Sequence, residues 1–238
     1  MRLEIGYLTM DKTTTTGTTE PDVVKTDVAE AVTNIPSPRL LRAMEVAARA
    51  HDGHYRKGTQ TPYVSHVFGV MHIASTARWE RTGFGVDVDA GMQQPSEDCL
   101  IACLFHDIFE DVPDSYPKQC MREEFGDYVV ELVQAVTKDE SLPSWRDRGE
   151  AYLEALRNTP HDEAFIVACA DKLHNITAIL ADETEIGQTF WDRFNVGLAG
   201  QQWWYESMCD IIGQRLPDLN LLEALQERVK LLSAIEYE

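Results

Sequence analysis

The sequence predicts an all-α protein, and three observations lead to this prediction. Apolar residues recur at helical spacing along most of the 238-residue chain. Helix-start signals such as Ser37-Pro38 and Ser96 precede these apolar stretches. Runs that alternate apolar and polar residues, as half-buried strands do, are almost absent. No internal repeat and no phosphate-binding loop of the G-x-x-x-x-G-K type is visible.

The expected helices follow one another from Ser37 onward. The first begins at Ser37-Pro38, and the second begins at Thr61-Pro62. Ser96 caps a third helix that we expect to continue through Phe109, and its centre, CLIACLF, is apolar all round and therefore buried. On the first helix, one face is expected to carry Leu40, Leu41, Met44, Ala47 and Ala48. Further helices are expected over residues 117–125, 127–136, 145–157, 160–180, 190–216 and 219–235.

The chain divides into a tail and one domain. Residues 1–36 are rich in threonine and acidic residues, which predicts a mostly disordered tail with a weak helical turn at Val28–Val32. The helical pattern then covers residues 37–238, a length that suits one large domain. Residues 81–97 form a Gly-rich loop inside this domain.

The charge and the cysteines exclude several classes of function. Lys and Arg number 21 against 40 Asp and Glu, so the net charge is −19. This charge disfavours a nucleic-acid polymer or an anionic membrane as a partner. The N-terminus lacks the pattern of a signal peptide, and no run approaches the ~18 apolar residues of a membrane span. The five cysteines show no C-x-x-C pair, which indicates free thiols and a cytoplasmic location.

The stretch CLFHDIFED places four ionisable residues in apolar surroundings. His106 and Asp107 lie among Leu, Phe and Ile side chains, and Glu110 and Asp111 follow about one helical turn later. Three neighbouring carboxylates repel one another unless a divalent ion or a proton relieves them. The alternative interpretation is a helix C-terminus whose acidic side chains are solvated.

Two further segments place polar residues inside apolar helices. In ADKLHN, Asp171 and Asn175 are four residues apart and share a helix face. A single Asp in such a place is usually paired with an Arg or caps a helix. In TPYVSHVFGVMHI, His66 and His72 interrupt an apolar helix, where each could be an ordinary core histidine.

Together these segments indicate a metal site. His66, His106, Asp107 and Asp171 supply two imidazoles and two carboxylates from three helices. Such a mixed nitrogen and oxygen set suits Mn²⁺ better than Fe²⁺, Zn²⁺ or Mg²⁺. Four protein ligands on a six-coordinate ion leave two positions for water and a phosphate oxygen.

The same residues resemble the H…HD…D pattern of the HD superfamily of metal-dependent phosphohydrolases. The stretches AARAHDGHYRKGTQTPYVSH, FHDIFEDV, FGDYVVELVQAVTKD and ADKLHN are similar to the hydrolase domain of the RelA/SpoT homologues. The resemblance covers residues 39–180 well and 190–235 more weakly. It implies an HD-domain helical bundle and a stand-alone small alarmone hydrolase. The 81–97 loop and the first 36 residues depart from the family pattern.

The resemblance also implies a role for each site residue. It assigns His66, His106, Asp107 and Asp171 as Mn²⁺ ligands, and Glu110 with Asp111 as the catalytic pair that orients and activates water. The residues that it implies for substrate binding are Arg56, Lys57, Lys172, Asn175, Arg193, Trp204 and Tyr205. Between Arg39 and Lys57 five basic residues stand against two acidic ones, which predicts a locally positive stretch at the substrate phosphates.

The function that this resemblance implies is a Mn²⁺-dependent (p)ppGpp 3′-pyrophosphohydrolase. It would convert ppGpp to GDP, and pppGpp to GTP, with release of pyrophosphate. One alternative is an HD-type phosphatase of NADPH or a nucleoside monophosphate. Another is a non-catalytic nucleotide-binding regulator. Exposed aromatic residues such as Trp203 and Trp204 would allow either a lid or a homodimer interface.

Overall fold

The prediction of an all-α fold is confirmed. The structure is a computed structural model, and it describes residues 35–80 and 91–237. In these ranges the chain forms ten α-helices, one 3₁₀ helix and two isolated β-bridges, with no sheet. The helices are α1 (Pro38–Ala50), α2 (Val64–Ser75), α3 (Glu97–Phe105), α4 (Ile108–Asp111), α5 (Lys118–Phe125), α6 (Asp127–Ala135), α7 (Trp145–Asn158), α8 (Asp162–Ile186), η1 (Gln188–Arg193), α9 (Gly197–Arg215) and α10 (Asn220–Ser233).

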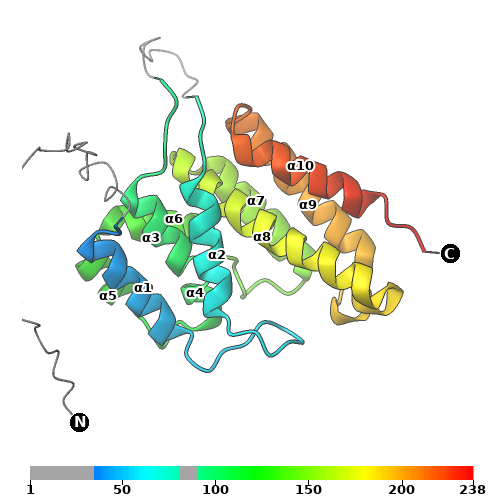
Figure 1. The fold of residues 1–238 in the computed structure, drawn as a ribbon, viewed down its shortest axis with the longest axis horizontal. Coiled ribbons are helices and arrows are strands. Elements are labelled where there is room, and N and C mark those ends of the chain that lie inside the picture. The colour runs from blue at the N-terminus through cyan, green and yellow to red at the C-terminus, as the bar shows by residue number, and fades with distance from the viewer. Residues whose placement is uncertain (1–34, 81–90, 238) are drawn as a thin grey trace, which may run out of the picture. The chain divides into compact units, whose positions relative to one another are not determined.

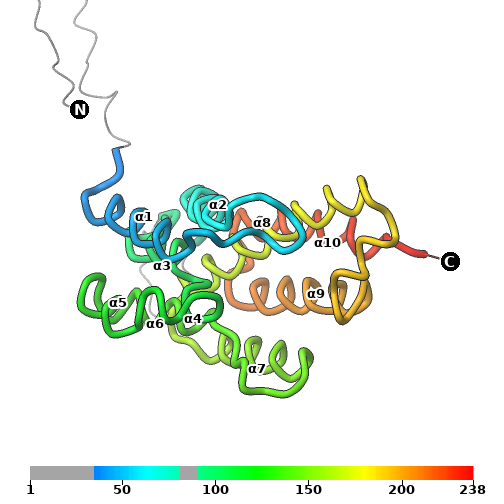
Figure 2. The backbone as a smooth tube through the Cα atoms, turned by 90° about the horizontal axis from the view of Figure 1, so that it is seen from below, coloured from blue at the N-terminus to red at the C-terminus, as the bar shows by residue number. Residues whose placement is uncertain are grey.

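Helix α8 is the centre around which the other helices assemble. It packs against α2, α3, α6, α9, α10 and η1. Figure 1 shows α1 to α6 gathered at one end of this body, with α9 and α10 at the other and α8 running between them. The tube in Figure 2 shows α9 running alongside α8. Side chains that face inward from α2, the α3–α4 junction and α8 therefore meet in the interior.

Helix α8 resembles a membrane-spanning helix in length and composition. Among the described residues, α8 alone is long and apolar enough to cross a membrane by length and composition. Its most apolar 18-residue window is 61% buried inside the protein. This burial is typical of the core helix of a globular domain, where apolar residues on every side contact other helices.

Serine caps begin three of the helices. Ser37 accepts a hydrogen bond from the backbone N–H of Leu40, and Ser96 accepts one from that of Cys99, as the sequence predicted. The expected face of α1 is partly wrong, because Leu41 is 49% exposed and Ala48 is exposed as well. The face that α1 buries consists of Leu40, Ala43, Val46, Ala47 and Ala50.

Three expected helix boundaries are also wrong. The helix expected from Ser96 to Phe109 breaks after Phe105, and α4 begins only at Ile108. The segment expected as one helix over 190–216 is split into η1 and α9, while α8 continues six residues beyond the expected end at Leu180. The break at residues 106–107 matters most, because it redirects the chain where His106 and Asp107 lie.

A buried carboxylate fixes the start of α3 against α8. Glu163 accepts hydrogen bonds from the backbone N–H and the hydroxyl of Ser96, at 2.6 and 2.7 Å, and from the Tyr128 hydroxyl at 3.0 Å. Three elements are thereby joined at one acceptor: α3, α6 and α8. Residues 1–34 of the expected tail, including Val28–Val32, and residues 81–90 of the expected 81–97 loop lie outside the described residues.

Candidate functional site

Three segments bring the four predicted metal ligands together. Helix α2 carries His66, the turn between α3 and α4 carries His106 and Asp107, and α8 carries Asp171. The two histidines are buried, with exposed fractions of 2% and 3%. The sequence therefore identified residues that the fold does bring to one point, although they lie up to 105 positions apart.

The ligand atoms of these residues converge. His66 Nε2 lies 3.2 Å from His106 Nε2, 3.3 Å from Asp107 Oδ2 and 3.2 Å from Asp171 Oδ1. His106 Nε2 lies 2.9 Å from Asp107 Oδ2 and 3.5 Å from Asp171 Oδ1. Ligands that bind one ion at about 2.0–2.2 Å are themselves separated by about 3.0–3.5 Å, and these five distances lie in or close to that range.

The hydrogen bond that His106 makes to Cys103 determines the protonation of the ring nitrogen that faces the other ligands. His106 Nδ1 lies 2.8 Å from the carbonyl oxygen of Cys103, which can only accept, so Nδ1 carries the proton. In the neutral ring, Nε2 then presents its lone pair to the carboxylates. Lone pairs directed at one another repel, so the arrangement calls for a cation or a proton between them.

The protonation states of the cluster agree with this requirement. Burial acts to raise the pKa of Asp107, but His106 holds it well below its usual range. Burial likewise acts to raise the pKa of Asp171, and Lys172 holds it well below the usual range. Burial acts to lower the pKa of His106, yet Asp107 and Asp171 raise it well above the usual value. The two carboxylates favour a positive charge between them, which is either a proton on His106 Nε2 or a divalent metal ion in its place.

The predicted catalytic pair lies on α4, directly after this cluster. Glu110 Oε1 accepts a hydrogen bond of 2.6 Å from the backbone N–H of Lys138, and the Lys138 ammonium lies 3.8 Å from Oε2. Burial raises the pKa of Glu110, and burial together with Asp107 raises that of Asp111. Raised carboxyl pKa values suit groups that exchange protons near neutral pH.

Tyr63 is a site residue that the sequence reasoning missed. Its hydroxyl donates a hydrogen bond of 2.6 Å to Asp107 Oδ2, and its ring stacks on His51 at 4.8 Å between centroids. Tyr63 therefore orients a predicted metal ligand from the start of α2. The available signal was its position three residues before His66, on the same side of the helix start.

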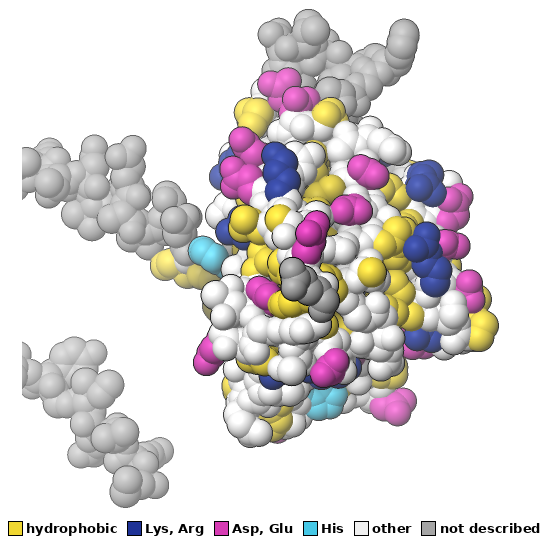
Figure 3. Space-filling view, turned by 90° about the vertical axis from the view of Figure 1, so that its right-hand side faces the viewer, with side chains coloured by type: hydrophobic (Ala, Val, Ile, Leu, Met, Phe, Trp, Pro, Cys, Tyr) yellow, Lys and Arg dark blue, Asp and Glu magenta, His cyan; other side chains and the backbone are white. Residues whose placement is uncertain are grey.

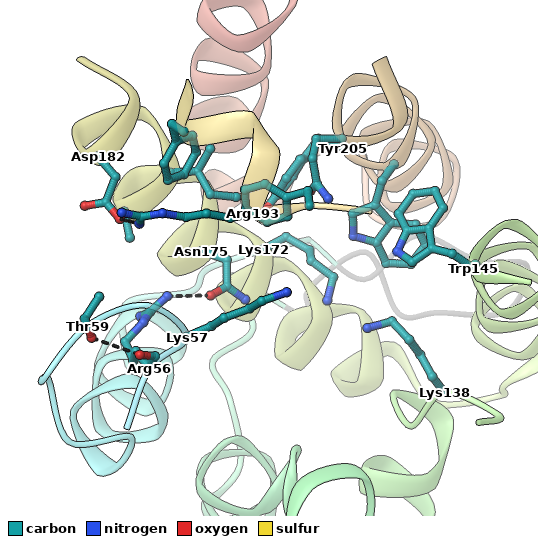
Figure 4. Close-up of a pocket in the computed structure, with 17 residues that line it drawn as sticks. Arg56, Lys57, Thr59, Lys138, Trp145, Lys172, Asn175, Asp182, Arg193 and Tyr205 are labelled. Atoms are coloured by element: carbon teal, nitrogen blue, oxygen red, sulfur yellow. Dashed lines mark hydrogen bonds and ion pairs between the residues drawn. The ribbon is translucent and has the colours of Figure 1, made fainter. Parts of the chain in front are cut away.

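Beside the cluster, the structure contains a cavity of about 350 Å³. Five cationic residues line it against one acidic residue, Asp182. In Figure 4 the side chains of Lys57, Lys138 and Lys172 point toward a common space, while Arg56 lies beside Lys57 and Arg193 lies near Asp182. The cavity thus concentrates positive charge within a chain whose net charge is −19. Figure 3 shows another part of the surface, where acidic and basic side chains are interspersed.

All seven predicted substrate-binding residues line this cavity. The prediction missed Lys138 and Trp145, which also line it. Their signal in the sequence was weak, because Lys138 stands in a polar loop and Trp145 at a helix start. The residues that line the cavity as predicted are Arg56, Lys57, Lys172, Asn175, Arg193, Trp204 and Tyr205.

The prediction of a locally positive stretch between Arg39 and Lys57 is only partly correct. Arg56 and Lys57 line the cavity, whereas the arginines of α1 do not. The α1 arginines instead form ion pairs with nearby acidic residues: Arg39 with Glu97 and Asp98, Arg42 with Glu45 and Glu124, and Arg49 with Glu45.

The expectation of an exposed Trp204 is wrong, because the ring is 6% exposed. Trp204 packs edge-on against Trp145 and Tyr152, and the Lys172 ammonium lies 5.4 Å from its ring centroid. Lys172 itself is buried between these rings and pairs with Asp171 at 2.5 Å. The aromatic residues of α9 and α7 therefore form a fixed wall around a buried cation.

The fold and the cluster define a helical protein with an interior site of two histidines and two carboxylates. The HD domain family matches residues 43–192, which is more than half of the chain. The chain belongs to the HD domain family.

Among curated proteins, several similar relatives carry related names. SpoT of Escherichia coli strain K12, a bifunctional (p)ppGpp synthase/hydrolase, is 30% identical over 146 residues, 59% of this chain. The chain spans only 18% of that relative's length. The guanosine-3′,5′-bis(diphosphate) 3′-pyrophosphohydrolases MESH1 of Danio rerio and Mus musculus are 31% and 30% identical. These matches cover 58% and 66% of this chain, and 67% and 76% of the relatives.

Solved structures show the same fold. A metazoan ortholog of SpoT, described as hydrolysing ppGpp, aligns with a TM-score of 0.64 and 26% identity, over 84% of this chain and 99% of that one. The Listeria monocytogenes protein lmo0812 aligns with a TM-score of 0.55 and 23% identity, over 70% of this chain and 97% of its own. The second likeness concerns the fold alone.

Proposed function

We propose that this chain is a Mn²⁺-dependent (p)ppGpp 3′-pyrophosphohydrolase. The observation that carries the proposal is that a cavity lined by five cationic residues adjoins the His/Asp cluster through Lys172. In the reaction, water attacks the phosphorus bonded to the 3′-oxygen, that P–O bond breaks, the 3′-oxygen takes up a proton to become a hydroxyl, and pyrophosphate is released. The products are GDP from ppGpp and GTP from pppGpp. The similarity to the MESH1 pyrophosphohydrolases and to the ppGpp-hydrolysing SpoT ortholog supports this choice of substrate.

The four-residue cluster is proposed to hold the metal ion. His66, His106, Asp107 and Asp171 would be its ligands, and a mixed imidazole and carboxylate set favours Mn²⁺. When bound, such an ion supplies Lewis acidity that activates water and neutralises phosphate charge. The chain's own part is to hold two ionised carboxylates and two imidazole lone pairs at the right spacing.

Glu110 and Asp111 are proposed to accept the proton from the attacking water. Both carboxyl groups have raised pKa values, so each can take up a proton without a large cost in free energy. Lys138 orients Glu110 through its backbone N–H and also lines the cavity. Lys138 therefore positions the proposed base through its backbone and faces the proposed phosphates with its side chain (Figure 4).

The cationic side chains of the cavity are proposed to bind the substrate phosphates. A guanosine tetraphosphate carries several negative charges, which Lys57, Lys172 and Arg193 would neutralise at close range. The −19 charge of the whole chain makes binding of a nucleic-acid polymer unfavourable.

We assign the activity to residues 37–238. A cytoplasmic location and a homodimer both stay predictions from the sequence.

A parallel hydrolysis assay tests this function. The full chain, loaded with Mn²⁺, is incubated separately with ppGpp, pppGpp, NADPH and deoxynucleoside monophosphates, and the products are identified by ion-exchange chromatography. We expect GDP or GTP with equimolar pyrophosphate, and no product after chelation of the metal. Release of orthophosphate from NADPH or a monophosphate instead would favour another HD-type phosphatase. No turnover of any substrate by the metal-loaded chain would favour a nucleotide-binding regulator.

A further inference from the structure

Arg56 connects the cavity to two of the proposed metal ligands. One nitrogen of its guanidinium, Nη1, lies 3.0 Å from His174 Nδ1, and the other, Nη2, donates a hydrogen bond of 3.0 Å to Asn175 Oδ1. Figure 4 shows the guanidinium directed at Asn175 along the cavity wall. His174 in turn contacts His66, and Asn175 contacts Asp171. We propose that Arg56 and His174 are positioning residues of the metal centre, which rests on the proposed role of the His/Asp cluster.

The contact with Arg56 determines the tautomer of His174. A guanidinium has only N–H donors, so His174 Nδ1 must accept from Arg56 and present a lone pair. The same nitrogen lies 3.0 Å from His66 Nδ1. With His174 Nδ1 as the acceptor, its single lone pair is shared between the Arg56 and His66 N–H groups, and the proton of the neutral His66 ring is placed on Nδ1. His66 Nε2 is left with its lone pair, directed at the cluster.

The hydrogen bond from Arg56 to Asn175 orients Asp171. Because Asn175 Oδ1 accepts from Arg56, its amide group is oriented with Nδ2 away from the guanidinium. Asn175 Nδ2 then donates a hydrogen bond of 2.6 Å to Asp171 Oδ1, the oxygen that faces both histidines. One guanidinium therefore orients a ligand on α2 and a ligand on α8.

Close packing holds His174 in place for this role. A Cβ atom added to Gly69 would lie 2.5 Å from His174 Cδ2 and Nε2, closer than side chains approach. The glycine on α2 thus lets the imidazole of α8 lie directly against the helix backbone. This contact brings His174 Nδ1 within reach of His66, one helical turn earlier on α2.

The affinity for Mn²⁺, measured without any nucleotide, tests the inference. Competition with a chelator of known affinity gives the metal dissociation constant of the full chain, and thermal melting confirms folding. Arg56→Lys keeps the positive charge but loses the two-pronged contact, and His174→Leu removes the acceptor. We expect each to weaken Mn²⁺ binding by about 10–100-fold, as is usual when a partner of a metal ligand is removed.

Two matched variants separate positioning from other effects. His174→Asn has nearly the shape of His174→Leu but keeps a polar acceptor near the Nδ1 position, so we expect it to recover most of the affinity. Lys57→Ala removes the neighbouring cation of the cavity, and its Mn²⁺ affinity should match the wild type while the KM for nucleotide rises.

The outcomes distinguish this inference from the proposed function. Mn²⁺ binding by Arg56→Lys and His174→Leu within about twofold of the wild type would overturn the positioning role and leave the metal site intact. A wild-type chain that binds no Mn²⁺ would overturn the metal site and the positioning role together. If His174→Leu does not fold, Arg56→Lys decides the question alone, because its side chain lies at the cavity wall.

Discussion

The backbone N–H of Lys138 donates a hydrogen bond of 2.6 Å to Glu110 Oε1, which joins the loop after α6 to α4. The Lys138 ammonium lies 3.8 Å from the other carboxylate oxygen. Burial raises the pKa of Glu110, whereas Lys138 opposes that effect through both contacts. The carboxyl group is therefore fixed in direction, while one oxygen keeps only a long contact. This arrangement suits a group that must hold an orientation and still exchange a proton.

Glu110→Gln should reduce kcat by about 10²–10⁴-fold and leave Mn²⁺ affinity unchanged. The amide oxygen of the variant can still accept from the Lys138 N–H, so the geometry is retained and only the proton acceptor is lost. Steady-state kinetics with ppGpp, together with metal analysis, measure both quantities. Glu154→Gln, on the exposed face of α7, serves as the control. Near wild-type rates for both Glu110→Gln and Asp111→Asn at full metal occupancy would refute the assignment.

Asp107→Ala should abolish both Mn²⁺ binding and turnover. It removes the carboxylate that lies 2.9 Å from His106 Nε2 and 3.3 Å from His66 Nε2. A ligand that binds only the folded state raises stability by about 2.7 kcal/mol at one hundred times its dissociation constant. Addition of Mn²⁺ should therefore raise the Tm of the wild type and of exposed Asp114→Ala, but not that of Asp107→Ala. An equal rise in Tm for Asp107→Ala would contradict its role as a ligand.

The ligand set could be predicted from the sequence because each ligand stands in apolar surroundings. A charged or polar side chain in such a helix needs a partner, and His66, Asp107 and Asp171 all meet that condition. The helix break at His106-Asp107 could not be predicted, because no Gly or Pro interrupts residues 97–109. The chain turns there through tertiary packing and through the hydrogen bond from His106 to Cys103.

The partners of these ligands could not be predicted for a related reason. Arg56 and His174 are 118 positions apart, and no periodicity links a loop residue to a side chain on α8. Likewise, Trp204 looked like an exposed aromatic because α9 carries polar and apolar residues on every side. Its burial depends on Trp145 and Tyr152 from α7, which reach it only in the folded chain.

Glu163→Ala should destabilise the fold by about 2–4 kcal/mol, because three hydrogen bonds to a buried carboxylate are lost. The hydroxyls of Ser96 and Tyr128 and one backbone N–H would lose their acceptor at the junction of α3, α6 and α8. Urea unfolding followed by circular dichroism measures the change in the free energy of unfolding. The exposed Glu154→Ala should change that free energy by less than about 0.5 kcal/mol. An equally small effect at Glu163 would show that the junction is not a determinant of stability.

His51→Leu should make the protein less sensitive to acid. Burial lowers the pKa of His51 from 6.5 to about 4, and Asp107 only partly opposes this shift. Because the unfolded chain binds a proton at higher pH than the folded chain, stability falls as the pH drops from 6.5 toward 4.

The substitution also removes two buried ring nitrogens that have no hydrogen-bond partner among the described residues. We therefore expect the Tm of His51→Leu at pH 7 to equal or exceed that of the wild type. Between pH 7 and pH 5 its Tm should fall less than that of the wild type. His72→Gln, at an exposed histidine of α2, should follow the wild-type curve. A loss of Tm on acidification as large in His51→Leu as in the wild type would show that protonation of another group controls acid stability.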